Sequence, residues 1–325
     1  MKLKKEMRRR FVAFFLTALI LWSTAGLILK MRAATASYIK WVSFTPTLEA
    51  IRKAYNVDVE FKGSIKMYEV LAYYSAKYGD SFKNFSSSKI DELTKKLKDG
   101  TPLEELTADL KNYNYYKEAY SAVLSEFTGE YTENGETKYG LKVYSPVASG
   151  YYYTHTSDFG NGRSFGFSRK HLGNDLFGSV GTPLTAVESG IVDMMGWNKY
   201  GGWRVGIRSF DGKRYYYYAH LRKDRPYNEN IKIGEVVRAG DVLGYLGATG
   251  YSEKENTNGM KTPHLHFGMQ LIFDYSQKEG NKEIWIDVYN IVRFLKNHTA
   301  EVVKNSDSGE YQRKHDFYEK NLETT

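Results

Sequence analysis

In the first half of the chain, apolar residues recur at the spacing of an α-helix. Three stretches show this pattern most clearly: residues 65–78, 88–98 and 113–127. The first of them ends at Gly79, which is typical of a helix stop. We therefore expect a mostly helical region within residues 33–130. Its many aromatic side chains are explained most simply as a core, and the alternative is a binding module.

After a polar, turn-rich stretch at residues 131–138, which we interpret as a linker, the pattern changes to short β-branched and aromatic runs separated by glycines. Residues 204–208 and 213–219 flank Asp211-Gly212 and predict a hairpin. Its second strand contains four consecutive tyrosines, residues 215–218. Neighbouring side chains on a strand point to opposite faces, so two tyrosines should pack inward and two should meet solvent or substrate.

The boundaries of this β part follow from the same pattern. It is expected to be mainly antiparallel and to cover residues 139–298, closing with a strand-to-helix segment at residues 284–296. Residues 299–325 are polar with sparse apolar positions and are expected to form a mobile tail.

The N-terminus predicts a membrane segment. Residues 1–10 are strongly basic, and residues 11–29 are an uninterrupted run of 19 uncharged, mostly apolar residues. Such a run is just long enough to cross about 30 Å of hydrocarbon as a helix. We expect a single-pass signal-anchor with a cytoplasmic N-terminus and the rest of the chain outside the cell. Cleavage near Ala36, which would release a secreted form, is the alternative.

Charge and cysteine content narrow the classes of partner. The net charge is +8, but residues 1–32 hold eight Lys or Arg and one acid, so the remaining chain is almost neutral. A nucleic-acid partner is therefore not expected. The chain has no cysteine, which excludes thiolate zinc ligands and cysteine nucleophiles and is compatible with export.

Two short motifs carry candidate chemistry. His264 and His266 are two residues apart and project from the same face if they lie on a strand. His171 and Asp175 are four apart and can converge across a turn or strand end. Two imidazoles and one carboxylate would leave zinc an open coordination position for water, as a catalytic site requires. Neither motif is decisive alone, since an isolated histidine is more often a surface or core residue.

The surroundings of the two motifs strengthen the interpretation. Residues 178–192, Tyr218-Ala-His220-Leu and residues 239–250 occur in order between them. Together these segments resemble the lysostaphin/LytM-type zinc metallopeptidases, which are peptidoglycan endopeptidases with the duplicated-hybrid-motif fold. The resemblance covers residues 139–297.

The resemblance implies a role for each motif residue. His171, Asp175 and His266 match the zinc ligands of that family, and His220 and His264 match residues with base, acid or stabilising roles. One departure is Gly268-Met269, where many relatives have an acidic residue. It changes no ligand and should affect substrate fit.

Two polar loops lead directly into the motifs. Residues 158–169 precede the first motif and residues 247–263 precede the last, so we expect them to form walls of the binding groove and to set substrate choice. Tyr200 to Trp203 could belong to the same rim or form a plain hairpin turn. His155, His298 and His315 are assigned no chemistry.

The expected fold class is α+β, with an N-terminal transmembrane helix, a small helical domain and a mainly antiparallel β catalytic domain. The expected function is that of a membrane-anchored zinc endopeptidase that hydrolyses peptide bonds in peptidoglycan stem peptides or cross-links. The alternative is a non-catalytic, membrane-tethered scaffold of the same fold, for example in a sporulation channel, with the helical region as its protein-binding surface. Retention of all five polar motif positions favours the enzyme.

Overall fold

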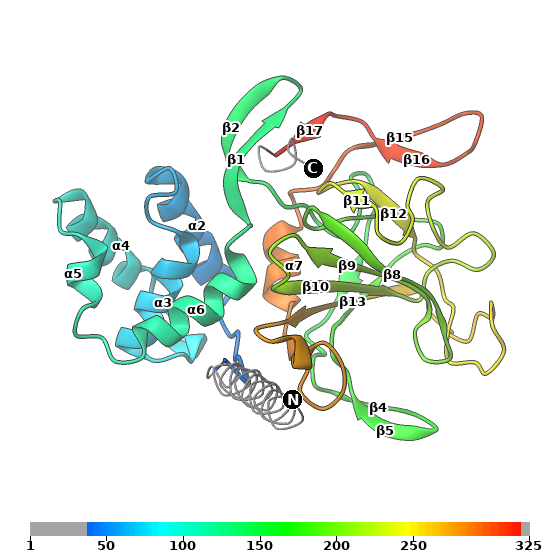
Figure 1. The fold of residues 1–325 in the computed structure, drawn as a ribbon, viewed down its shortest axis with the longest axis horizontal. Coiled ribbons are helices and arrows are strands. Elements are labelled where there is room, and N and C mark those ends of the chain that lie inside the picture. The colour runs from blue at the N-terminus through cyan, green and yellow to red at the C-terminus, as the bar shows by residue number, and fades with distance from the viewer. Residues whose placement is uncertain (1–37, 320–325) are drawn as a thin grey trace, which may run out of the picture. The chain divides into compact units, whose positions relative to one another are not determined.

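The structure, a computed structural model, describes residues 38–319 (Figure 1). Its first part is helical, as the spacing predicts. The elements are α2 (Leu48–Glu60), α3 (Met67–Tyr78), α4 (Ser87–Lys98), α5 (Leu103–Thr107) and α6 (Tyr113–Leu124), with a 3-10 turn at Phe82–Asn84. The helices expected at residues 65–78, 88–98 and 113–127 are confirmed within a few residues at their ends.

Helix α2 lies in a stretch for which the sequence pattern made no clear prediction. Its start is capped by Thr47, whose hydroxyl accepts a hydrogen bond from the Ala50 backbone N–H at 3.3 Å. Near its end, the buried Asp58 carboxylate accepts hydrogen bonds from the Met67 backbone N–H (2.8 Å) and the Thr128 hydroxyl (2.7 Å). The Tyr139 hydroxyl donates a third. Asp58 therefore fastens α2 both to α3 and to the first β-hairpin.

The first β-hairpin includes residues 131–138, the stretch that was expected to be a linker. Strands β1 (Thr128–Glu133) and β2 (Glu136–Leu141) pair antiparallel around a turn at residues 134–135, and β17 (Phe317–Tyr318) adds to the other edge of β1. Residues 131–138 are thus strand and turn. The domain boundaries themselves remain a prediction.

The expected tail also contains structure. Residues 302–319 include β15 (Val302–Lys304), β16 (Tyr311–Arg313) and β17. The side chain of Phe317 is only 1% exposed and lies 5.6 Å from the ring of Tyr144, measured between centroids. Glu319 forms an ion pair with Lys142 at 2.8 Å. A few buried contacts at wide spacing hold this segment, which is why its apolar pattern was too weak to predict strands.

The β part is built on an eight-stranded antiparallel sheet with the order β11-β8-β9-β10-β13-β6-β3, in which β14 also pairs with β13. Its strands are β3 (Thr154–His155), β6 (Asn174–Phe177), β8 (Gly190–Asn198), β9 (Gly202–Ser209), β10 (Arg214–Ala219), β11 (Val236–Val237), β13 (His264–Leu271) and β14 (Ile284–Ile286). Two further pairs are β4 (Gly162–Phe165) with β5 (Phe167–Lys170) and β7 (Pro183–Thr185) with β12 (Val242–Tyr245). The predicted β9–β10 hairpin and the strand-to-helix segment, β14 followed by α7 (Tyr289–Leu295), are confirmed.

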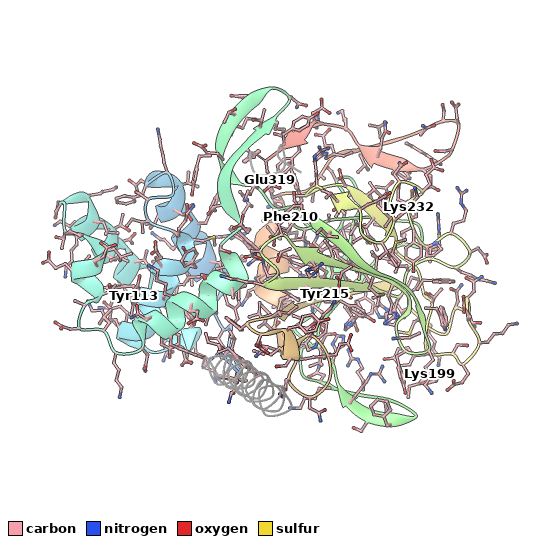
Figure 2. All side chains as sticks on the ribbon, viewed as in Figure 1. Tyr113, Lys199, Phe210, Tyr215, Lys232 and Glu319 are labelled. Atoms are coloured by element: carbon pink, nitrogen blue, oxygen red, sulfur yellow. The ribbon has the colours of Figure 1, made fainter. Side chains whose placement is uncertain are left out.

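The four tyrosines of β10 alternate as expected. Tyr216 and Tyr218 are buried in the core, at 1% and 0% exposure. Tyr215, labelled in Figure 2, and Tyr217 point to the opposite face, where they line a pocket. Strand β10 therefore contributes tyrosine side chains both to the core and to the lining of the pocket.

The expected fold class is wrong on one point. Among residues 38–319, no helix is both long and apolar enough to cross a membrane. The longest helix in this range, α2, has 13 residues, whereas a spanning helix needs about 20 apolar residues. The fold class of the described chain is α+β without a spanning helix. The helix expected at residues 11–29 and the basic tail at residues 1–10 lie outside the described residues.

A buried arginine joins the helical region to the sheet. Arg214 at the start of β10 is 0% exposed and forms two hydrogen-bonded contacts with Glu188, at 2.7 and 3.1 Å. It also donates to Asp211 (3.0 Å) and to the carbonyl of Ala122 near the end of α6 (2.8 Å). A cation at this position complements the partial negative charge of the helix C-terminus.

We predict that Arg214→Leu destabilises the fold by about 3–5 kcal/mol, because it leaves the buried Glu188 carboxylate without its cation. Urea unfolding of the purified chain measures the loss. The control is Lys53→Gln, which removes an exposed ion pair with Asp91 and should cost less than about 1 kcal/mol. Equal losses in the two variants would contradict the role given to Arg214.

Candidate metal centre and active site

The register of β13 brings the two motifs together. His266 lies directly opposite Asp175 of β6, and on the other side it lies opposite Ala219 of β10, the residue before His220. His264 and His266 project to the same face of β13, whereas Leu265 between them is fully buried in the core. Strand geometry alone thus places three of the predicted site residues side by side.

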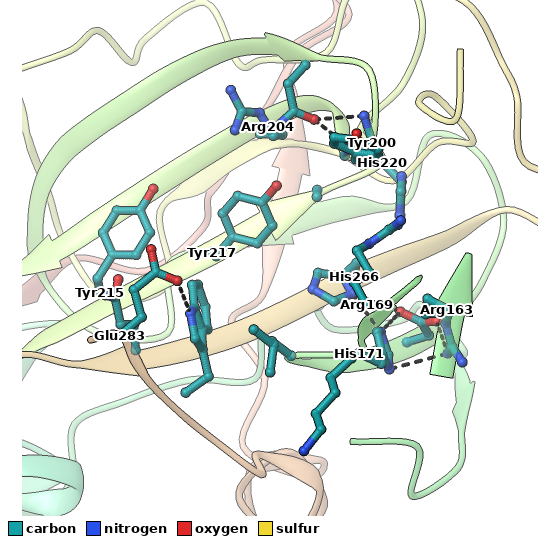
Figure 3. Close-up of a pocket in the computed structure, with 18 of the residues that line it drawn as sticks. Arg163, Arg169, His171, Tyr200, Arg204, Tyr215, Tyr217, His220, His266 and Glu283 are labelled. Atoms are coloured by element: carbon teal, nitrogen blue, oxygen red, sulfur yellow. Dashed lines mark hydrogen bonds and ion pairs between the residues drawn. The ribbon is translucent and has the colours of Figure 1, made fainter. Parts of the chain in front are cut away.

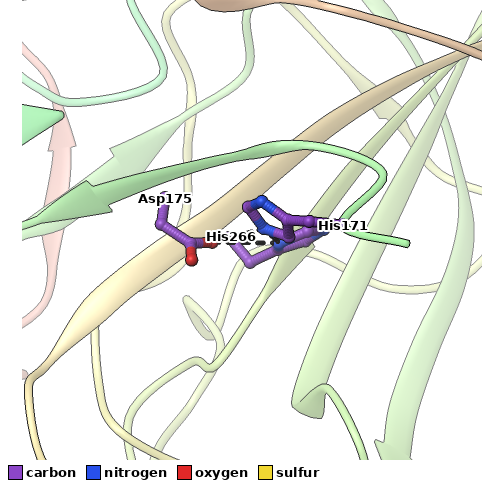
Figure 4. Close-up of side chains that lie close together, drawn as sticks. All are labelled: His171, Asp175 and His266. Atoms are coloured by element: carbon purple, nitrogen blue, oxygen red, sulfur yellow. Dashed lines mark hydrogen bonds and ion pairs between the residues drawn. The ribbon is translucent and has the colours of Figure 1, made fainter. Parts of the chain in front are cut away.

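The predicted metal ligands meet at their donor atoms (Figure 4). His171 Nε2 lies 2.8 Å from His266 Nδ1 and 2.9 Å from Asp175 Oδ1, and His266 Nδ1 lies 3.1 Å from the same Asp175 oxygen. Two imidazole nitrogens and one carboxylate oxygen facing a common point form a donor set that suits zinc.

The tautomer of His171 is set by its surroundings. Its Nδ1 lies 3.1 Å from the backbone carbonyl and 3.3 Å from the carboxylate of Asp158, two acceptors that together outweigh the donor Arg163 Nη2 at 3.3 Å, so Nδ1 carries the proton. The lone pair is then on Nε2, the atom that faces Asp175 and His266. Such a contact behind a metal-binding imidazole orients the ring and selects the tautomer.

A polar network holds Asp158 in place. Its carboxylate accepts a hydrogen bond from Asn174 Nδ2 at 2.9 Å and forms an ion pair with Arg163 at 3.1 Å. Asn174 is in turn bonded to His155 Nδ1 at 2.6 Å. His155, to which the sequence analysis assigned no chemistry, therefore supports the predicted ligand His171 through the side chains of Asn174 and Asp158.

The Asp175 carboxyl is ionised. Burial opposes its charge, but the interactions with the neighbouring imidazoles of His171 and His266 outweigh that effect and hold its pKa well below the ordinary range. Arg163 adds an ion pair to the other carboxylate oxygen at 3.1 Å. The ligand is thus available as an anion at neutral pH.

Glycine is required inside the first motif. A Cβ atom at Gly173 would lie 2.7 Å from the imidazole of His266 and 2.7 Å from the carbonyl oxygen of Phe267. No such contact occurs in folded proteins, so any side chain here would displace a ligand. The spacing His-x-Gly-x-Asp is therefore a packing requirement as well as a ligand pattern.

The other two predicted residues form a second histidine pair beside the ligands. The ring centroids of His220 and His264 are 4.8 Å apart. His220 donates from Nδ1 to the Thr249 carbonyl at 2.7 Å, and His264 lies 2.9 Å from the Thr262 carbonyl through the same atom. Each ring therefore has its lone pair on Nε2. Burial, together with the nearby His264 and His266, lowers the pKa of His220 to about 3, so its ring is neutral at neutral pH.

All five predicted residues line one pocket of about 620 Å³ (Figure 3). The two predicted loops contribute Arg163, Arg169, Tyr251 and Met260, and the stretch between β8 and β9 contributes Tyr200 and Gly201. Tyr215, Tyr217 and Trp285 form another part of the lining. The loops that lead into the motifs thus contribute to the walls, as expected.

The departure from the family pattern at Gly268-Met269 is accompanied by close packing around Gly268. A Cβ atom there would lie 2.9 Å from the ring of Trp285 and 2.9 Å from the Leu172 carbonyl oxygen. Trp285 comes from β14, which pairs with β13 just beyond the histidines. The indole occupies space that a side chain at position 268 would need.

The sequence analysis missed the residues around the ligands. Asn174 lies within the first motif, so its amide could have been noted as a partner for a ligand or its neighbour. Asp158 and Arg163 belong to a segment predicted only as a loop wall, and nothing in their spacing indicated contacts with His171 and Asp175. His298 and His315 do not line the pocket.

Comparison with known proteins is consistent with this geometry. Residues 169–280, which include all five predicted site residues, match peptidase family M23. The chain is 36% identical over 171 residues to the L-Ala--D-Glu endopeptidase of Bacillus subtilis, a match that covers 52% of this chain and 50% of that protein. It is 40% identical over 98 residues to lysostaphin of Staphylococcus staphylolyticus, covering 30% of this chain and 18% of lysostaphin. The chain therefore spans half or less of the length of these two relatives.

A solved structure shares the fold over a longer range. The crystal structure of a candidate glycyl-glycine endopeptidase LytM from Ruminococcus gnavus is 24% identical, with a TM-score of 0.53. The match covers 76% of this chain and 89% of that one, so the common fold extends beyond residues 169–280.

We predict that Gly173→Ala lowers zinc affinity about tenfold or more, because the added methyl group pushes the His266 ring away from the other two ligands. Titration of the metal-free chain with zinc against a competing chelator measures the affinity. The matched control is Gly162→Ala, where an added Cβ meets no atom within 4 Å. Wild-type zinc affinity in Gly173→Ala would show that the contact with His266 does not matter.

Proposed function

Starting from the peptidase family M23 domain that this chain carries at residues 169–280, we propose that the protein is a zinc endopeptidase that hydrolyses peptide bonds in peptidoglycan. The observation that supports this most directly is the convergence of His171 Nε2, Asp175 Oδ1 and His266 Nδ1 at one point of a pocket that also contains His220 and His264. The names of the two relatives, an L-Ala--D-Glu endopeptidase and lysostaphin, support the substrate class.

The metal would be held by His171, Asp175 and His266. When bound there, zinc supplies Lewis-acid chemistry, which polarises a peptide carbonyl and makes a water molecule more acidic. The three ligands contribute one negative charge, so the site retains positive charge for the developing oxyanion. Because His171 and Asp175 are fixed by Asp158 and Arg163, little reorganisation is needed at the reacting centre.

His220 is suited to take a proton from the attacking water. Its ring is neutral, its Nδ1 proton is donated to Thr249, and its Nε2 is the free acceptor. Its backbone is also fixed in an unusual conformation, with φ at 62° and its N–H bonded to the Gly201 carbonyl at 2.7 Å. A non-glycine residue held in the left-handed region is often a functional one.

His264 would complement His220. Its ring lies beside that of His220, and its Nε2 is 3.8 Å from the second oxygen of Asp175. Once its Nε2 has taken up a proton, His264 can donate a hydrogen bond to the scissile carbonyl oxygen or pass that proton to the leaving amine. The two histidines thus provide the two proton-transfer positions that amide hydrolysis needs.

The scaffold alternative is not favoured. A scaffold needs no intact metal-binding geometry, whereas this chain has all three ligands in contact, their supporting network and both histidines of the second pair. The substrate lies outside the cytoplasm, so the proposal places the catalytic domain there as well. Binding of a protein partner by the helical region stays a prediction.

We expect the zinc-loaded chain to release peptide-cleaved fragments from purified cell walls, and mass spectrometry of the fragments would identify the bond. His266→Ala should lose both zinc and hydrolysis. His220→Ala should keep zinc and lose activity by about 10²–10⁴-fold, the usual contribution of a general base. His315→Ala, which changes an exposed histidine outside the pocket, is the control.

Two results would contradict the proposal. The first is a folded, zinc-loaded wild-type chain that releases no peptide-cleaved fragment. The second is undiminished hydrolysis by His266→Ala, which would remove the metal site from the reaction.

A further inference from the structure

Arg169, at the end of β5, is held between two tyrosines at the edge of the pocket. Its guanidinium carbon lies 5.0 Å from the ring centroid of Tyr200 and 5.1 Å from that of Tyr251. Its Nη2 donates a hydrogen bond to the Tyr251 hydroxyl at 2.6 Å. Stacking against aromatic faces fixes the plane of a guanidinium and leaves its N–H edge for a ligand.

One of its donors has no partner. The Nη1 atom of Arg169 is buried and makes no hydrogen bond within residues 38–319. Buried polar groups in native proteins are nearly always paired, so an unpaired one at a pocket wall indicates a group supplied from outside. Arg163 on the neighbouring strand differs, because its charge is used by Asp158 and Asp175.

The unpaired donor is close to the proposed reacting groups. The ring of Tyr251 stacks on His220, with centroids 5.8 Å apart and planes at 21°, and its hydroxyl reaches Arg169. A single tyrosine therefore separates the guanidinium from the proposed base. All three residues line the same pocket, and Arg169 and His220 are labelled in Figure 3.

The backbone conformation of Tyr251 supports the packing of its ring against His220 and Arg169. Its φ is 46°, a left-handed conformation that a bulky residue rarely adopts, and its N–H bonds to the Tyr200 carbonyl at 3.3 Å. Strain of this kind persists only where the surroundings enforce it and is concentrated at ligand sites. Tyr200, Tyr251 and Arg169 thus hold one another in a fixed arrangement.

The charged side chains that line the pocket decide which chemical group of a ligand binds best beside Arg169. Arg169 and Glu283 are well separated along the pocket (Figure 3), and Lys170, Lys278 and Glu279 also line it. A positively charged, planar donor with a free N–H recognises a carboxylate best.

We propose that Arg169 is a specificity-determining residue that binds a carboxylate of the substrate beside the scissile bond. The preferred substrate is an acidic peptide: a peptidoglycan stem peptide whose glutamyl residue carries a free carboxylate, in preference to the same peptide with a carboxamide there. This inference rests on the proposed function, since it concerns the substrate of the same pocket.

The test compares two synthetic stem peptides that differ only in that carboxylate or carboxamide. Isothermal titration calorimetry of the full chain in chelator, where no hydrolysis occurs, gives a dissociation constant for each. Wild type should bind the carboxylate form about 10–100-fold more tightly, the usual effect of a charge-assisted hydrogen bond. Arg169→Gln should lose this preference, and Arg169→Lys should retain part of it.

Lys254→Gln, which removes an exposed charge outside the pocket, should bind like wild type. A purely structural role of Arg169 would weaken binding of both peptides equally and leave their ratio unchanged. That result would overturn the inference. Equal binding of the two peptides by wild type, or no binding of either, would also overturn it.

Hydrolysis of the same two peptides by the zinc-loaded chain separates this inference from the proposed function. Cleavage of both peptides at equal rates, with equal binding, would keep the endopeptidase and remove the role of Arg169. Carboxylate-selective binding that depends on Arg169, without cleavage, would keep the subsite and remove the enzymatic function.

Discussion

The antiparallel pairing of β13 with β6 on one side and β10 on the other is the constraint on which the site depends. It sets His266 opposite Asp175 and places His220 just beyond the end of β10. Side chains alternate along a strand, so a shift of one residue would turn His264 and His266 into the core and Leu265 into the pocket. The buried Leu265 therefore fixes the register in which the ligands meet.

Within that register, charge balance explains how the donor atoms remain close together. Asp158 and Asp175 are buried carboxylates, and both form ion pairs with Arg163. Two acids and one guanidinium leave one net negative charge, beside the imidazoles of His171 and His266. A divalent cation would convert this to one net positive charge, which is stabilising for an anion formed at the reacting centre. The supporting residues thus adjust the electrostatics of the site as well as its geometry.

The parts of the structure that could be predicted from the sequence are those that depend on short-range periodicity. The two faces of β10, the shared face of His264 and His266 and the three apolar helices follow from the spacing of side chains along one element. The contacts of Asp158, Arg163 and Arg169 do not, because each depends on how a loop folds against a distant segment. The β1–β2 hairpin was missed for a related reason: its residues are mostly polar and partly exposed, so the pattern resembled a linker.

Strand β10 also connects the helical region to the chemistry. Arg214 at its beginning is bonded to the Ala122 carbonyl of α6, Tyr215 and Tyr217 in its middle line the pocket, and His220 follows its end. A strand held at one end by a buried ion pair has little freedom to shift along its neighbours. The helical region therefore contributes to the position of the pocket tyrosines and of His220, even though none of its side chains lines the pocket. In physical terms, it is part of the support of the active site, and strand β10 links its folding to the geometry of the metal centre.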